Sequence, residues 1–178
     1  MKHFPKLADP ATVDPALVRE VRGDQETVHK NSGRSGTYLL VLENSSMKRI
    51  DVGKLGRVRF SKGYYVYVGS GMNGLDCRVA RHYRTKKSTH WHIDHITPRH
   101  MPIVRCYKIR SALRLEEMIV KRCEKIAPGN IQGFGSSDSS RRSHLFFFPS
   151  PPHERRDFLD IVLDFMTFSE NSNPGCYE

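Results

Sequence analysis

The chain has 178 residues, of which 38% are hydrophobic, so it can bury the core of one domain and still carry polar ends. Its net charge of +10 predicts a polyanionic partner, most often nucleic acid. The absence of any apolar run of about 18 residues excludes a membrane span, and the opening residues lack the apolar stretch of a secretory signal. Cysteines without a C-x-x-C pair predict reduced thiols and a cytoplasmic location.

The first part of the chain predicts a polar arm followed by a strand-rich segment. Residues 1–35 are polar, carry charges of both signs and are interrupted by prolines, so we expect them to form an N-terminal arm. Aromatic, β-branched and alternating apolar residues then predict four short strands separated by turns, at 37–42, 48–52, 57–60 and 64–68. Consecutive short strands of this kind favour an antiparallel sheet.

The rest of the chain predicts helices mixed with further strands. A short helix at 75–84 follows from Leu75, Val79 and Tyr83, which lie four residues apart. We further expect a strand at 103–109, a helix from 112 to about 126 capped by Ser111, a strand at 144–148 and an amphipathic helix at 155–168. The apolar side of the last helix either packs on the sheet or pairs with a second subunit, and the sequence leaves both open.

These elements predict an α+β fold with a small, mostly antiparallel sheet flanked by helices. The proline-rich stretch that ends at Pro152 indicates a domain boundary. We therefore expect a polar arm at 1–35, a central domain at 36–149, and a C-terminal amphipathic helix with a tail at 150–178.

The most informative stretch is the tyrosine-rich strand at 64–68 with the turn and helix that follow it. Gly69 and Gly71 break the strand sharply. In the helix, Arg78 and His82 are four residues apart and share a face distinct from the apolar one. A strand that turns and presents an arginine and a histidine on one surface is suited to binding a phosphate.

Several motifs together carry a resemblance to a known family. Gly36-Thr37-Tyr38 and Tyr67-Val68-Gly69 match the two halves of the GIY-YIG nuclease signature. Arg78 and Glu116 stand where that family carries its arginine and its metal-binding glutamate. Further matching stretches, in chain order, are Gly63 to Ser70, Arg78 to His82, His90 to Asp94, Phe134 to Asp138 and Ser143 to Leu145. Over about residues 36–148 the chain therefore resembles the GIY-YIG nucleases, and among them the Uri superfamily of endonucleases.

The chain also departs from that pattern. The interval from Tyr38 to Tyr67 is longer than is typical, and an extra β-hairpin at 48–60 accounts for it. Ser139 and Arg141 stand where the Uri branch usually has a cysteine-containing stretch, so no metal or thiol role is carried over to that loop. A tyrosine is usual at His95 and a cysteine at Glu117.

The resemblance implies a GIY-YIG-type fold and a metal-dependent endonuclease. In that interpretation Glu116 binds Mg²⁺ (or Mn²⁺), and Arg78 holds the scissile phosphate. Tyr38 or Tyr67 orients or deprotonates the attacking water, and His82 shares a proton or holds the water. A free tyrosine has a pKa of about 10, so a tyrosine base requires a site that lowers it.

Other residues are expected to bind nucleic acid or to support the site. The candidates for following the DNA backbone are Arg81, Arg84, Lys86 and Lys87, together with Arg141 and Arg142. The candidates for supporting roles are His90, His92, Asp94, Ser137, Asp138 and His144. The segment around Asp94 is compatible with a strand or a helix, and one structural role has His92 and Asp94 bonded to each other, bracing the Arg78 helix.

We therefore predict an endonuclease that hydrolyses phosphodiester bonds in DNA, with DNA repair or the processing of structured DNA as its setting. One alternative is a non-catalytic nucleic-acid-binding module. A second is a zinc hydrolase, because His90-x-His92-x-Asp94-His95 has the spacing of a two-zinc cluster. The sequence does not distinguish a monomer from a homodimer, or DNA from RNA as the partner.

Overall fold

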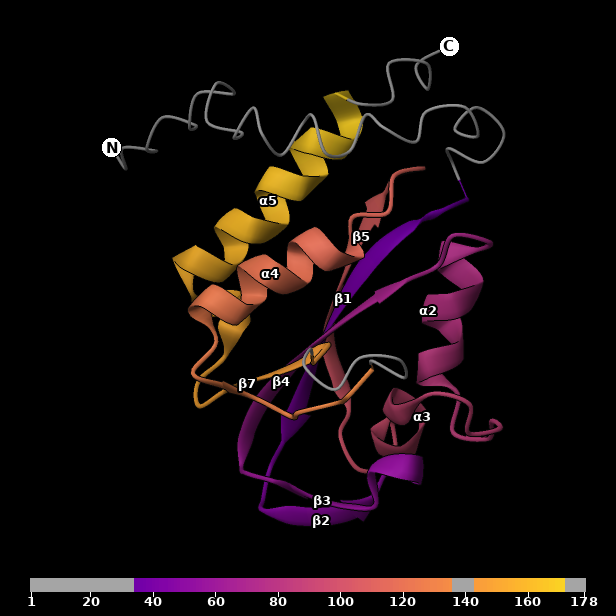
Figure 1. Ribbon diagram of the computed structural model, residues 1–178, viewed down its shortest axis with the longest axis vertical. Coiled ribbons are helices and arrows are strands. Elements are labelled where there is room, and N and C mark those ends of the chain that lie inside the picture. Colours follow the sequence, from indigo (N-terminus) through magenta and orange to yellow (C-terminus); the bar gives the residue numbers. More distant parts are fainter. Residues whose placement is uncertain (1–33, 136–142, 172–178) are drawn as a thin grey trace.

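The computed structural model describes residues 34–135 and 143–171 (Figure 1). The strands are β1 (Gly36–Asn44), β2 (Lys48–Asp51), β3 (Arg57–Phe60), β4 (Gly63–Ser70), β5 (Ile103–Arg110), β6 (Gly129–Asn130) and β7 (Leu145–Phe148). The helices are α2 (Leu75–Tyr83), α3 (His92–Ile96), α4 (Glu116–Ile126) and α5 (Arg156–Asn171), with the short 3-10 turns η3 (Gly53–Leu55) and η4 (Pro152–Glu154). The predicted α+β class is confirmed.

The main sheet places the two tyrosine motifs on neighbouring strands. Its five strands run in the order β5-β1-β4-β7-β6, and each neighbouring pair is antiparallel. The register between β1 and β4 sets Tyr38 opposite Gly69 and Leu40 opposite Tyr67. Because side chains alternate between the faces of a sheet, Tyr38 and Tyr67 are diagonal neighbours on the same face.

Helices cover both faces of this sheet. In Figure 1, α4 and α5 lie on one side of the strands, and α2 and α3 lie on the other. The α4–α5 side is an apolar cluster in which Leu39, Val41 and Val66 pack against residues of both helices. The opposite side holds both tyrosines together with Leu75 and Val79 of α2. The candidate site therefore lies on the α2 side.

The structure settles the open question about the C-terminal helix. The side chains of Phe158, Ile161, Val162 and Phe165 in α5 are buried in the same cluster as the sheet, so the apolar side of this helix packs on the chain's own core. No helix within residues 34–135 and 143–171 is both long and apolar enough to cross a membrane.

The β-hairpin expected at 48–60 is confirmed, whereas the single antiparallel sheet that the turns had suggested for the first four strands is not formed. β2 and β3 pair with each other as a separate two-stranded sheet, while β1 pairs with β4. Ile50 and Phe60 of this hairpin are buried against the α2 side of the main sheet. Burial of these side chains explains the difference, because the hairpin covers the sheet face instead of extending its edge.

Helix α4 begins at Glu116 and not at 112, and Ser111 does not cap it. The hydroxyl of Ser111 accepts a hydrogen bond from the Leu113 backbone N–H, which forms a local turn before the helix. This late start places Glu116 in the first turn of α4, on the side of β4.

Candidate active site

Tyr38, Tyr67 and His82 meet on the sheet face that α2 covers. Tyr38 comes from β1, Tyr67 from β4 and His82 from α2, and all three side chains are buried. The Tyr38 Oη atom lies 2.7 Å from His82 Nε2. The ring centroid of Tyr67 is 6.2 Å from that of Tyr38 and 6.2 Å from that of His82. The structure therefore brings together three of the residues predicted to act in catalysis.

Gly69 makes this packing possible. It lies opposite Tyr38 in the β1–β4 register, and the Tyr38 ring sits directly over it. A Cβ atom at this position would come within 2.6 Å of Tyr38 Oη and 2.9 Å of Tyr67 Cε1. Gly71, in the turn after β4, likewise allows a close approach, because a Cβ there would lie 2.7 Å from the Cα of Leu75 at the start of α2.

Burial keeps the tyrosines and the histidine neutral. Desolvation, followed by the neighbouring Tyr67, raises the pKa of Tyr38 far above its usual value. Desolvation, followed by the charge of Glu116, raises the pKa of Tyr67 as well. Desolvation and then the charge of Lys87 lower the pKa of His82 to about 4. A tyrosine that acts as a base was expected to need a lowered pKa, but these surroundings raise the pKa of both tyrosines.

Glu116 projects from the first turn of α4 and is paired with His144, next to β7. The Glu116 Oε1 atom lies 2.9 Å from His144 Nδ1. Burial alone would raise the pKa of Glu116, but hydrogen bonds from His144 and Ser70, with the charges of His144 and Arg78, lower it overall. The bond to Glu116 raises the pKa of His144. At neutral pH this site therefore presents an ionised carboxylate.

Arg78 lies between this carboxylate and an exposed aromatic ring. Its positive charge lowers the pKa values of Tyr38, Tyr67 and Glu116, which places it within electrostatic range of all three. Its guanidinium carbon is 3.9 Å from the centroid of the Trp91 ring, a cation–π distance. Arg78, Arg81 and Trp91 line a pocket of about 240 Å³ at the start of α2.

Asp94 supports this arrangement from α3. Its buried carboxylate accepts hydrogen bonds from the Arg81 guanidinium at 2.9 and 3.1 Å and from the backbone N–H groups of His90 and Trp91. Lys87 Nζ lies 3.5 Å from the same carboxylate. Asp94 thus connects α3 to α2, as one structural interpretation expected of this segment.

His92 does not take part in that connection. Its Nδ1 atom accepts a hydrogen bond from the Gly135 backbone N–H, so the expected bond between His92 and Asp94 is not formed. The physical reason is that residues 92–96 are helical, which separates these side chains, and that Asp94 has cationic partners on α2 and in the following loop.

The predicted DNA-contacting cations differ in how they are placed. The charged ends of Arg81 and Lys87 are held by Asp94, whereas Arg84 and Lys86 are exposed. The candidates Ser137, Asp138, Arg141 and Arg142 lie outside the described residues, as do residues 1–33 of the predicted arm and residues 172–178 of the predicted tail.

The predicted zinc cluster of His90, His92, Asp94 and His95 is not formed. Over residues 34–135 and 143–171, no group of three or more His, Cys, Asp or Glu side chains could hold a metal ion. In the predicted zinc cluster, the Asp94 carboxylate is already bonded to cations and backbone amides. Glu116 supplies one ionised carboxylate, and Mg²⁺ is commonly bound through one or two carboxylates with water and substrate phosphate oxygens.

Two residues of the site were missed as functional candidates in the sequence. Trp91 is 38% exposed, and its ring stacks with the guanidinium of Arg78. Ser70 bonds to Glu116 from the end of β4. A lone tryptophan beside two histidines was the available signal for Trp91, and the residue directly after the second tyrosine motif was the signal for Ser70.

The fold and site define an α+β domain in which two tyrosines of the central strands lie near a histidine and an arginine of α2 and within electrostatic range of a glutamate of α4. The chain belongs to the family described as "Domain of unknown function DUF123", whose model matches residues 37–167. A comparison with curated proteins gave no match, and neither did a comparison with solved structures.

Proposed function

We propose that this protein is a metal-dependent endonuclease that hydrolyses phosphodiester bonds in DNA. The observation that carries the proposal is the meeting of Tyr38, Tyr67, His82 and Arg78 on the α2 side of the sheet, with Glu116 of α4 close enough for its charge to raise the pKa of both tyrosines. The net charge of +10 supports a polyanionic substrate. A setting in DNA repair or in the processing of structured DNA belongs to this proposal. So does a cytoplasmic location, with which the free thiols of Cys77, Cys106 and Cys123 agree.

Arg78 binds the scissile phosphate in this proposal. A guanidinium is permanently charged and has donors matched to two phosphate oxygens. Stacking on Trp91 restricts the guanidinium to one orientation, so Trp91 is a positioning residue. The small pocket beside them leaves room for the phosphate to approach.

Tyr38 orients the attacking water, and His82 holds the Tyr38 hydroxyl in place through the 2.7 Å hydrogen bond. With a pKa of about 4, His82 is neutral at physiological pH and a weak proton acceptor. The pair therefore acts by fixing a hydroxyl group in position and not by storing a proton. This assignment keeps the orienting role expected for the tyrosine and omits the role of a pre-ionised base.

Glu116 is the residue that would hold Mg²⁺ or Mn²⁺, with Ser70 and His144 fixing the direction of its carboxylate. When bound there, the ion supplies Lewis-acid stabilisation of the negative charge at the phosphate. Hydrogen bonds such as those from Ser70 and His144 to Glu116 commonly orient the ligands of metal sites.

The test is cleavage of labelled single-stranded, duplex and branched DNA in Mg²⁺ or Mn²⁺. We expect cleavage by the wild type, and a loss of about 10²-fold or more in Arg78→Ala and Glu116→Gln. Glu117→Gln is the matched control, because this exposed neighbour of Glu116 is also in the first turn of α4. Equal cleavage by all the folded proteins refutes the assignment of the site.

A non-catalytic nucleic-acid-binding module is the second candidate. The pairing of the Glu116 carboxylate with His144 favours it, because a group committed to an ion pair within the chain is less available to a metal ion. Salt-dependent DNA binding by the wild type, with no cleavage in either metal, would decide for this function.

A further inference from the structure

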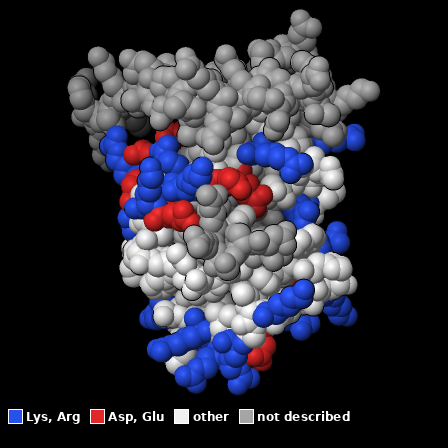
Figure 2. All heavy atoms as spheres, viewed as in Figure 1, with Lys and Arg blue, Asp and Glu red and all other residues white. Residues whose placement is uncertain are grey.

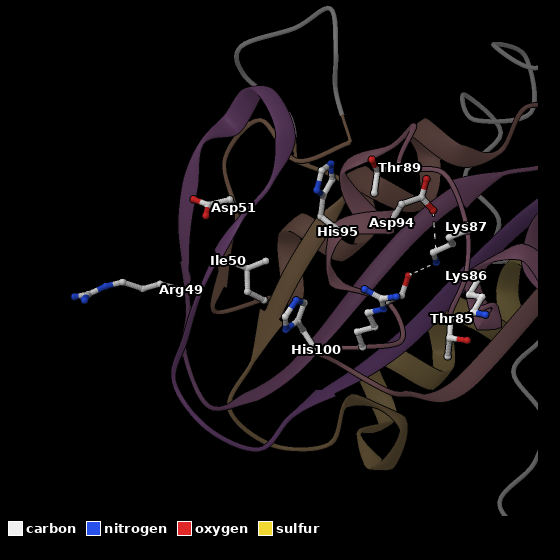
Figure 3. A pocket seen from close by; sticks show the side chains of 12 residues that line it. Arg49, Ile50, Asp51, Thr85, Lys86, Lys87, Thr89, Asp94, His95 and His100 are labelled. Carbon is white, nitrogen blue, oxygen red and sulfur yellow. Dashed lines mark hydrogen bonds and ion pairs between the residues drawn. The ribbon is translucent and has the colours of Figure 1, made fainter.

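A second cleft lies beside the candidate active site. It has a volume of about 630 Å³ and is bounded by the β2–β3 hairpin, the loop after α2, and α3 with the turn that follows it. Figure 3 shows Ile50 and His100 facing each other near its middle, with Lys86 and Thr85 on the opposite wall from the hairpin. None of the five proposed active-site residues lines this cleft.

The cleft carries excess positive charge. Arg49, Lys86, Lys87 and Arg99 line it, against two carboxylates, Asp51 and Asp94. Both carboxylates are already paired, Asp51 with an arginine of β3 at 3.2 Å and Asp94 with Arg81 at 2.9 Å. Within the described part of the chain, no carboxylate pairs with Lys86 or Arg99. These two cations are therefore available to an anionic ligand.

The surface around the cleft is basic as well. Figure 2 shows Lys and Arg gathered at the end of the molecule that the hairpin forms. The exposed side chains of Arg49, Lys54, Arg57 and Arg59 belong to this end. In Figure 3 the Arg49 side chain extends away from the cleft, so it adds charge to the rim and not to the interior.

The two walls of the cleft are tied together. The Lys48 ammonium of β2 donates a hydrogen bond to the backbone carbonyl of His100. The His95 ring of α3 lies against the turn of the hairpin, so that a Cβ on Gly53 would be 3.2 Å from His95 Nε2. Such contacts make a preformed cleft, which binds a ligand at a lower cost in ordering.

The cleft is also connected to the candidate active site. Asp94 lines the cleft, while Arg81, to which it is bonded, lines the small pocket that contains Arg78. The Arg81–Asp94 pair is therefore a shared wall between the two hollows. A polyanionic chain whose phosphate is bound at Arg78 can therefore pass along this wall to the cations of the cleft, Lys86 and Arg99.

We infer that the cleft binds the sugar–phosphate backbone of the DNA strand that flanks the scissile phosphate. The inference rests on the proposed function, which supplies the substrate. Lys86 and Arg99 contact phosphate oxygens, and the hydroxyls of Thr85 and Thr89 are further donors. Contacts of this kind set the register of the strand without reading its bases, so the cleft contributes affinity in a sequence-independent way.

The test is DNA binding across a range of salt concentrations with the full chain. The double variant Lys86→Ala/Arg99→Ala is compared with Lys121→Ala/Lys125→Ala, which removes two exposed lysines of α4 on the other side of the sheet. Loss of two phosphate contacts reduces the slope of log K against log salt by about 1.8 in duplex DNA. We expect this change, with a loss of affinity of about tenfold or more, in the cleft variant only.

The outcomes separate the two ideas. Unchanged affinity and slope in the folded cleft variant, or a change equal to that of the control, overturn the inference and leave the nuclease proposal in place. A wild type that binds DNA without cutting it refutes the nuclease proposal. In that case the comparison of salt dependence between the wild type and the cleft variant still tests the cleft inference. A wild type that does not bind DNA overturns the cleft inference directly.

Discussion

Replacing Gly69 with alanine tests whether the tyrosine pair depends on close approach to the backbone. The new Cβ would lie 2.6 Å from Tyr38 Oη and 2.9 Å from Tyr67 Cε1, whereas non-bonded carbon atoms rest at about 3.5–4.0 Å. Both rings are buried, so they cannot withdraw freely. We expect about 2 kcal/mol from overpacking and about 1 kcal/mol from loss of the Tyr38–His82 hydrogen bond.

The total of about 3 kcal/mol corresponds to a fall in melting temperature of roughly 6–12 °C for a domain of this size. The assay is thermal and urea unfolding followed by circular dichroism. Gly129→Ala is the matched control, since its Cβ would be 3.9 Å from Phe147, an ordinary contact on a short strand, and we expect it to change stability by less than about 1 kcal/mol. A Gly69→Ala protein as stable as the Gly129→Ala protein would refute the packing argument.

Three further predictions follow from the same geometry. Asp94→Asn leaves Arg81 and Lys87 without their buried carboxylate and should cost about 3 kcal/mol in chemical unfolding. Asp76→Asn, which removes exposed ion pairs with Lys108 and Arg110, should leave the free energy of unfolding nearly unchanged. The pKa of His82 falls from about 6.5 to about 4 on folding, so its contribution to stability is present above pH 6.5 and is lost as the pH falls toward 4; the stability advantage over His82→Gln should shrink across that range. Trp91→Leu should reduce cleavage about tenfold at an unchanged melting temperature, and Trp91→Phe should retain more activity, because an aromatic face still orients Arg78.

The sequence predicted those parts of the fold that depend on local pattern. The tyrosine-rich run at 64–68 was sufficient to locate β4, and the spacing of Leu75 and Val79 located α2. The pairing between strands was harder to predict, because β4 pairs with β1 and β7 and not with the adjacent β3. That choice depends on the burial of Ile50 and Phe60 beneath the main sheet, which is a property of tertiary packing.

The candidate site shows the same limit. The motifs indicated Tyr38, His82 and Glu116, because each stands at a recognisable position in the chain. Their electrostatics could not be predicted, since the pKa shifts arise mainly from burial. Likewise, the bond between Arg81 and Asp94 joins a helix to a segment whose helical or extended state the sequence left open.

The buried hydrogen bond between Tyr38 and His82 itself favours a functional site over a purely structural one. A hydrogen bond between neutral groups adds only about 1 kcal/mol, and apolar groups of the same shape can replace both partners at little cost. In the proposed nuclease, this neutral hydroxyl–imidazole pair, within electrostatic range of Arg78 and of an ionised Glu116, orients the attacking water.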